Sequence, residues 1–240
     1  LSGDLTWITP SDSGIFNIAI DVEEYRKGVK IGNIVRDMQI EVYDTKNKHP
    51  SQSNPGDFCI QAGDRLTFDI IATDTESDSI KQWATGGPFV VESNPAAYTV
   101  MYDSADIGYS RARFSWQTDC SHVREQYYTA IFKEEDSHLE TPLVDIQNVN
   151  IKVLGPAPEQ PYLIPGSNSV TASWPVDTCQ SVTAYQLYRK IEPAAYVPDS
   201  CTGGIPESTG YELVGATNGR LDTLMVDDNT SPFQTGFTVS

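Results

Sequence analysis

The sequence repeats itself over a distance that matches one protein domain. The segment Phe16–Val42 aligns without a gap on Tyr127–Val153, a constant offset of 111 residues from position 16 to position 127. A tryptophan precedes each copy, Trp7 in the first and Trp116 in the second. A repeat of about 110 residues has the size of a β-sandwich domain and is much longer than the unit of a solenoid. We therefore expect an excerpt that holds the end of one sandwich, one complete sandwich and a further region.

Hydrophobic periodicity predicts strands almost everywhere and helices almost nowhere. Apolar residues alternate with polar ones over 16–22 and 34–42, and a Gly-containing turn at 25–28 separates the two segments, which is typical of a hairpin. In the second copy, residues 127–132 alternate out of phase with the alignment of the repeat. A β-bulge in one copy would account for this, but the pattern does not decide the inward face.

Two Pro-containing segments divide the chain. Residues 44–58 are polar and are interpreted as a linker, and the Pro-rich segment 155–161 predicts a second, semi-rigid one. The closing strands of a sandwich are missing after residue 239, and no export signal opens the sequence, so we expect truncation at both ends and a signal that lies upstream or has been removed. The expected domains are the end of a first Ig-like repeat at 1–43, a complete repeat at 44–154 and a truncated domain at 155–240.

The charge excludes several classes of partner. The net charge is −17, from 33 acidic and 16 basic residues. No basic stripe is available to displace counterions from phosphates, which argues against nucleic acid and anionic membranes. No apolar run reaches the roughly 18 residues of a membrane helix, so we expect no membrane insertion within this segment. The acidic surface indicates a solubility function, with calcium binding as the alternative.

The four cysteines predict disulfides and an oxidising location. Cys59 and Cys120 fall in the complete repeat, and Cys179 and Cys201 fall in the last region. Pairing within domains therefore predicts Cys59–Cys120 and Cys179–Cys201, with free buried thiols as the alternative. Disulfides persist outside the cytosol, so an extracellular or cell-surface location is expected.

An acidic turn is the best metal candidate. Asp74, Glu76 and Asp78 alternate with other residues on a predicted turn, where carboxylates can converge on calcium. The EF-hand pattern is absent, and a solvated turn is the alternative interpretation. No cofactor is expected, with calcium on this turn as the alternative.

Three tyrosines mark the candidate ligand surface. Tyr98, Tyr102 and Tyr109 lie in the loop-like region 93–111. Exposed aromatic rings stack on sugars or anchor protein contacts, so glycans or proteins of the cell surface are the expected partners. Ordinary packing of the rings beneath a long loop is the alternative.

No motif supports catalysis. The signatures of serine hydrolases, zinc proteases and nucleotide-binding loops do not occur. The adjacent carboxylates of residues 134–136 are expected to point apart on a solvated turn, unlike a glycosidase pair. Cys120-Ser121-His122 is interpreted as a disulfide cysteine beside a surface histidine. We expect no enzyme and no catalytic residues.

The last region resembles a fibronectin type III domain. The pattern V-x-A-x-W at Val170–Trp174 and the pattern Y-x-L-Y-R at Tyr185–Arg189 are similar to strands B and C of that fold. The resemblance implies that Trp174 lies in the core and that Tyr185 and Leu187 pack across from it.

The whole arrangement resembles the large secreted surface proteins of the Bacteroidetes. The resemblance implies an all-β fold, tandem Ig-like sandwiches of the polycystic-kidney-disease or cadherin type followed by a fibronectin type III-like sandwich, in proteins of gliding motility or type IX secretion. It implies a non-catalytic structural or adhesive module, associated with the outer membrane, that spaces and presents other domains of the same chain. A carbohydrate-binding accessory region of a secreted polysaccharide-degrading enzyme is the alternative. The resemblance is carried by five segments: Phe16–Arg26, Arg36–Ile40, Ala84–Phe89, Cys120–Arg124 and Val153–Pro158.

Overall fold

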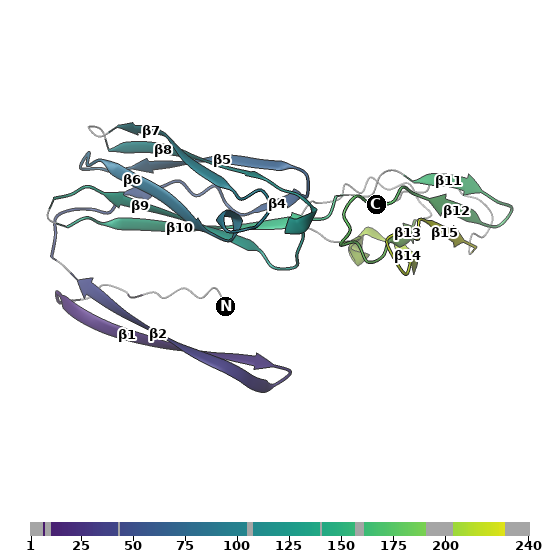
Figure 1. The fold of residues 1–240 in the computed structure, drawn as a ribbon, viewed down its shortest axis with the longest axis horizontal. Coiled ribbons are helices and arrows are strands. Elements are labelled where there is room, and N and C mark those ends of the chain that lie inside the picture. Colours follow the sequence, from purple (N-terminus) through teal and green to yellow (C-terminus); the bar gives the residue numbers. More distant parts are fainter. Residues whose placement is uncertain are drawn as a thin grey trace. The chain divides into compact units, whose positions relative to one another are not determined.

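A computed structural model describes most of the chain. The described residues are 7, 11–42, 44–104, 108–139, 141–156, 161–190 and 204–228. The chain divides into two compact units, Leu1–Lys48 and His49–Ser240, and Figure 1 shows the strands that build each of them. The described part is nearly all β, as the alternating sequence predicts. None of its helices is long and apolar enough to span a lipid bilayer.

The first unit is one long antiparallel hairpin. Its strands are β1 (Gly14–Arg26) and β2 (Val29–Val42). Lys27 and Gly28 connect them with φ angles of 50° and 79°, the two left-handed residues that match the twist of a tight hairpin. The predicted hairpin is confirmed, and the register shifts between Glu24 and Tyr25, which is a β-bulge in the first copy of the repeat.

The second unit begins with a complete two-layer sandwich, visible as stacked layers of arrows in Figure 1. One sheet has the order β3-β5-β8-β7 and the other has the order β4-β10-β9-β6. All neighbours are antiparallel except β4 and β10, which are parallel. The strands are β3 (Ser51–Gln52), β4 (Phe58–Gln61), β5 (Arg65–Thr73), β6 (Ile80–Gly86), β7 (Ala97–Ser104), β8 (Tyr109–Gln117), β9 (Tyr128–Asp136) and β10 (Val144–Leu154). Short 3-10 helices follow β6 and β8, at Gly87–Phe89 and Cys120–His122.

The segment 44–58 belongs partly to this sandwich, so its interpretation as a linker is wrong over that part. Ser51 and Gln52 pair with Thr73 and Ala72 as an edge strand. The Gln52 side chain is buried and donates a hydrogen bond to the Phe132 carbonyl oxygen at 3.3 Å. Polar composition is misleading here because a buried amide with a hydrogen-bond partner is tolerated in a core.

The core of the sandwich lies between the two sheets and is largely aromatic. Phe114 and Trp116 of β8 face Phe132 of β9 and Ile151 of β10, and all four are fully buried. The ring of Phe68 stacks on Phe114 with centroids 4.7 Å apart. Buried aromatic rings of this size dominate the hydrophobic contribution to stability.

Strand β9 has its inward face at every second residue from Tyr128. Tyr128, Ala130 and Phe132 are buried, while Thr129 and Ile131 are only partly so. This settles the face that the sequence left open. The ungapped alignment of the two copies starts at residue 127 in the second copy, whereas the inward face starts at Tyr128. The alignment is therefore displaced by one residue along the first strand of the repeat.

The C-terminal part of the second unit holds two small sheets. One has the order β11-β12-β15 and the other pairs β13 with β14. Trp174 is buried against Tyr185, with ring centroids 5.4 Å apart, and Leu187 packs in the same cluster, so the predicted core position of Trp174 is confirmed. The strands are β11 (Tyr162–Pro165), β12 (Val170–Ser173), β13 (Gln186–Arg189), β14 (Glu212–Ala216) and β15 (Leu224–Asp227), with a 3-10 helix at Glu207–Thr209.

Candidate functional site

The outer face of the β3-β5-β8-β7 sheet collects aromatic and basic side chains. Every second residue of β8 points away from the core, which brings Tyr109, Arg111 and Arg113 to this face. Tyr102 of β7 is the cross-strand partner of Arg111, and Asp69 of β5 is the partner of Arg113. We call these five side chains the Tyr–Arg face.

On the Tyr–Arg face, the Asp69 carboxylate accepts hydrogen bonds from two guanidinium groups. Arg113 donates from Nε to Asp69 Oδ1 at 2.7 Å and from Nη2 to Oδ2 at 3.1 Å, and Arg111 donates from Nε to Oδ2 at 2.8 Å. Arg111 Nη2 is also bonded to Oδ2. Hydrogen bonds from Arg113 and then Arg111 lower the pKa of Asp69 to about 2. Asp69, Arg111 and Arg113 together therefore carry a net positive charge in the physiological pH range. Both arginine side chains remain more than 40% exposed.

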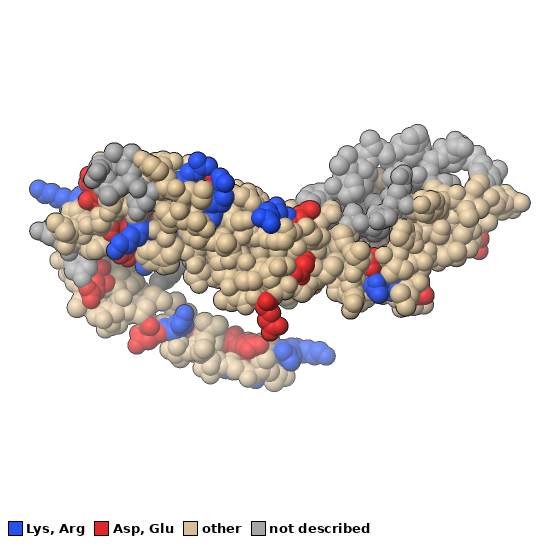
Figure 2. Space-filling model, turned by 45° about the horizontal axis from the view of Figure 1, so that its top comes forward, with Lys and Arg blue, Asp and Glu red and all other residues tan. Residues whose placement is uncertain are grey.

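Charge on this face has the opposite sign to that of the chain. The charged side chains that face outward on β5 and β8 are Arg65, Asp69, Arg111 and Arg113, whereas the chain carries −17. In Figure 2, where the top of Figure 1 comes forward, blue side chains gather over the side of the sandwich formed by β5, β7 and β8. A local positive patch on an acidic protein attracts anionic groups.

Two of the three predicted tyrosines lie together on this face. The Tyr102 and Tyr109 rings have centroids 5.9 Å apart at 58°, and Tyr102 is 52% exposed. Tyr98 instead points inward, because it is the partner of Phe114 and packs against Phe132 at 5.3 Å. Burial, and secondarily the Glu134 charge, raise the pKa of the Tyr98 hydroxyl. The predicted surface of three rings is therefore wrong for Tyr98, because region 93–111 is largely a strand with two faces.

The acidic turn is stabilised by its own backbone. Asp74 is buried, and its Oδ1 accepts hydrogen bonds from the N–H groups of Glu76 at 2.9 Å and Asp78 at 3.1 Å. Glu76 accepts a hydrogen bond from the Thr75 hydroxyl at 2.7 Å. Among the described residues no group of three acidic, histidine or cysteine side chains could hold a metal ion. The turn thus does not bring all three predicted ligands together, and calcium binding stays a prediction.

Glu134 is fully buried, which corrects its interpretation as a solvated turn residue. It lies in the middle of β9 on the inward face and not on a turn. Its Oε1 accepts a hydrogen bond from Gln82 Nε2 at 2.7 Å, and Ser110 donates to Gln82 Oε1 at 3.3 Å. Desolvation raises the pKa of Glu134 to about 7, and the Asp145 charge adds to this. Asp136, two residues further along the same face, is also buried.

A disulfide joins the sandwich to the C-terminal sheets. Cys120 and Cys179 are bonded, with Cα atoms 5.1 Å apart and a sequence separation of 59. Both predicted pairings, Cys59–Cys120 and Cys179–Cys201, are therefore wrong. Cys59 is also disulfide-bonded, which confirms oxidation at three of the predicted cysteines, and Cys201 lies outside the described residues.

His122 is a structural residue beside this disulfide and not a surface histidine. It is 1% exposed, its Nδ1 accepts a hydrogen bond from the Asp119 N–H at 2.9 Å, and its Nε2 lies 2.8 Å from the Ser93 carbonyl oxygen. Hydrogen bonds from Ser121 and then Ser93 hold the pKa of Asp119 well below its usual range. This capping box fixes the helix that carries Cys120.

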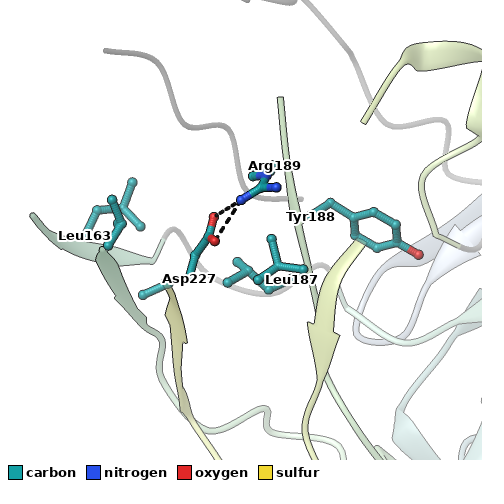
Figure 3. Close-up of a pocket in the computed structure, with 8 residues that line it drawn as sticks. Leu163, Leu187, Tyr188, Arg189 and Asp227 are labelled. Carbon is teal, nitrogen blue, oxygen red and sulfur yellow. Dashed lines mark hydrogen bonds and ion pairs between the residues drawn. The ribbon is translucent and has the colours of Figure 1, made fainter. Parts of the chain in front are cut away.

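A small apolar hollow lies between the two C-terminal sheets. Leu163 and Leu187 line it, together with Arg189 and Asp227. Figure 3 shows the Arg189 guanidinium reaching the Asp227 carboxylate across the hollow, with the Tyr188 ring pointing away from this pair. The two Arg189–Asp227 contacts are 2.9 and 3.2 Å, and the Asp227 side chain is only 4% exposed. The pair connects β13 to β15 and is part of the module's core.

Comparison with known proteins gives weak structural likenesses only. No family model matches the chain, and no curated protein does. The sialic acid binding region of a Streptococcus sanguinis adhesin is 12% identical, with a TM-score of 0.34, over 59% of this chain and 51% of that structure. Domains 4 and 5 of the S-layer protein SbsC are 14% identical, with a TM-score of 0.27, over 61% of this chain and 61% of that structure. A PapD-like domain of human CEP192 is 10% identical, with a TM-score of 0.35, over 54% of this chain and 99% of that structure.

Proposed function

We propose that this chain is a non-catalytic part of an extracellular or cell-surface protein, in which linked β-sandwich modules space and present neighbouring domains. The observation that carries the proposal is the disulfide Cys120–Cys179, which lies between two modules and not within one. A disulfide at this position needs an oxidising compartment and limits bending across the Pro-rich segment 155–161. The resemblance to Bacteroidetes surface proteins adds outer-membrane association to the proposal.

The test of the spacer function is the rotational diffusion of the two modules, measured by ¹⁵N relaxation. With the disulfide intact, residues 49–154 and 162–228 are expected to report one common correlation time. In the Cys120→Ala/Cys179→Ala double variant, with the disulfide of Cys59 also reduced, the smaller module is expected to tumble faster than the sandwich. Independent tumbling in the oxidised wild type would refute the spacer function, and chemical shifts that stay native in each module serve as the folding control.

A second candidate function is supported by the Tyr–Arg face. Two neighbouring rings offer a stacking platform, and the surplus guanidinium charge beside them offers bidentate hydrogen bonds to a carboxylate. We propose that this face binds a carboxylated glycan. This is the glycan-binding alternative made specific, since the net positive charge that Arg111 and Arg113 leave beside Asp69 favours an anionic sugar over a neutral one.

Retention on immobilised polysaccharides, in calcium and in chelator, tests the glycan proposal. Acidic polysaccharides are expected to retain the chain, and Tyr102→Ala and Arg111→Ala are each expected to weaken retention at least tenfold. The matched control is Tyr127→Ala, because Tyr127 is also exposed, at 56%, and lies outside the Tyr–Arg face. Equal retention on neutral and acidic polysaccharides, or an equal loss in the control, would remove the proposal.

A further inference from the structure

The hairpin β1–β2 has one apolar face that the described residues of its unit leave largely exposed. In its register Phe16 pairs with Ile40, Ile18 with Met38 and Val22 with Ile34, so these side chains share one face. Ile34 is 63% exposed, Val22 51% and Met38 39%. The opposite face is mostly polar, with Asn17, Asp21 and Glu23 among its residues. An isolated two-stranded hairpin of this kind is marginally stable in water.

The same register occurs in the complete sandwich, where the face is covered. Tyr128 pairs with Ile151 and Ala130 pairs with Val149, and all four are at most 4% exposed. The pair Phe16–Ile40 takes the place of Tyr128–Ile151, and the pair Ile18–Met38 takes the place of Ala130–Val149. The apolar face of β1–β2 is thus equivalent to the inner face of β9–β10.

An aromatic pair supports this correspondence independently of the strand register. Trp116 meets the Tyr128 ring edge-on, with centroids 4.9 Å apart at 71°. Trp7 meets the Phe16 ring in the same way, at 4.8 Å and 81°. Trp7 is the tryptophan that precedes the first copy of the repeat, so the first copy reproduces the β8-to-β9 ring contact as well as the β9–β10 hairpin.

We propose that β1–β2 is the last hairpin of another Ig-like sandwich, and that its apolar face is covered by a sheet of the β3-β5-β8-β7 type. In the complete module the covering strands precede β9 along the chain. We therefore assign the covering sheet to the same polypeptide, on the N-terminal side of the hairpin. Its inner face is expected to carry large apolar residues equivalent to Leu66, Ile70 and Phe114, which contact the β9–β10 side of the described core.

Hydrogen exchange measured by mass spectrometry tests this assignment. The exchange rates of the amides of residues 16–22 and 34–40 are compared with those of residues 128–132 and 147–151. The second set is the internal reference for a hairpin whose apolar face is covered. In the 240-residue chain the hairpin amides are expected to exchange quickly. In the natural polypeptide extended N-terminally by one sandwich domain, about 100 residues, they are expected to slow by about a thousandfold, as cooperative units do when they are buried.

A pair of matched variants separates the two faces of the hairpin. In the extended polypeptide Ile20→Lys is expected to abolish the protection of the hairpin, because Ile20 lies on the apolar face. Val35→Lys, on the opposite face beside Asp21, is expected to leave it intact. Fast exchange in the extended polypeptide, or equal effects of the two variants, overturns the proposal. A concentration-dependent dimer of the 240-residue chain with a protected hairpin also overturns it, because a second copy would then be the cover.

Discussion

The buried carboxyl of Glu134 gives the sandwich a pH dependence that can be calculated. Glu134 is 0% exposed, and the groups that face it are Gln82 through a hydrogen bond, and Tyr98 and Asp145 through charge. Its pKa rises from the ordinary 4.5 to about 7 in the folded protein. The folded state therefore binds the proton more tightly than the unfolded state between these two values.

The sign and size follow from proton linkage. A carboxyl with a raised pKa in the folded state contributes its full stability below pH 4.5, and that contribution is lost as the pH rises through 7. The difference between the two pKa values corresponds to roughly 3 kcal/mol of unfolding free energy. The wild type is expected to lose about this amount from Glu134 between pH 4.5 and pH 8, whereas Glu134→Gln, which cannot ionise, is expected to lose none of it.

The assay is the exchange of the slowest amides of β9 and β10, because these report the unfolding of this module alone. Wild type, Glu134→Gln and the control Glu135→Gln are compared at pH 5 and pH 8 after correction for the intrinsic exchange rate. Glu135 is the adjacent residue on the outward face, with its side chain 33% exposed. An equal change in stability between the two pH values in wild type and Glu134→Gln would refute the reasoning.

Two further substitutions test other contacts. Arg189→Met removes the guanidinium that bonds the buried Asp227 carboxylate at 2.9 and 3.2 Å, so the free energy of unfolding of the C-terminal module is expected to fall by about 3 kcal/mol, as measured by urea denaturation; a loss below 1 kcal/mol would show that this ion pair contributes little. Gly86→Ala places a methyl group 2.2 Å from the Thr129 carbonyl oxygen, whereas Gly63, also at positive φ, has open space around it. Gly86→Ala is therefore expected to lower the melting temperature of the sandwich far more than Gly63→Ala. The cost of Gly63→Ala is the unfavourable backbone conformation alone, about 1–2 kcal/mol. Equal shifts of the two melting temperatures in calorimetry would contradict the close approach at Gly86.

The parts of the fold that local pattern determines were predictable. Alternation around a Gly-containing turn predicts the β1–β2 hairpin, and the tryptophan of V-x-A-x-W predicts the core position of Trp174. The disulfide pairing was not predictable in this way. The sequence reasoning paired cysteines within one expected domain, whereas the bond Cys120–Cys179 depends on how two modules meet. Glu134 escaped prediction because the three consecutive acidic residues 134–136 are interpreted from sequence as a solvated turn, whereas β9 continues through all three.

The candidate site was predictable only in part. Tyr102 and Tyr109 could be singled out as aromatic residues, but their faces depend on the register of β7 against β8. Arg111 and Arg113 give the signal that the sequence reasoning missed. Arg111 and Arg113 follow Tyr109 at intervals of two residues in an alternating strand. Residues at this spacing lie on one face of the strand, so the sequence indicated a face with one aromatic and two basic side chains.

The disulfide also determines how the chain would carry mechanical load. While the Cys120–Cys179 bond is intact, β9, β10 and the segment that follows them lie in a closed loop that a pull on the two ends of the chain cannot extend. That loop spans 59 residues, which would release about 200 Å if it were pulled straight. A pulling experiment on the oxidised chain is therefore expected to lack this length, and to show it only after reduction.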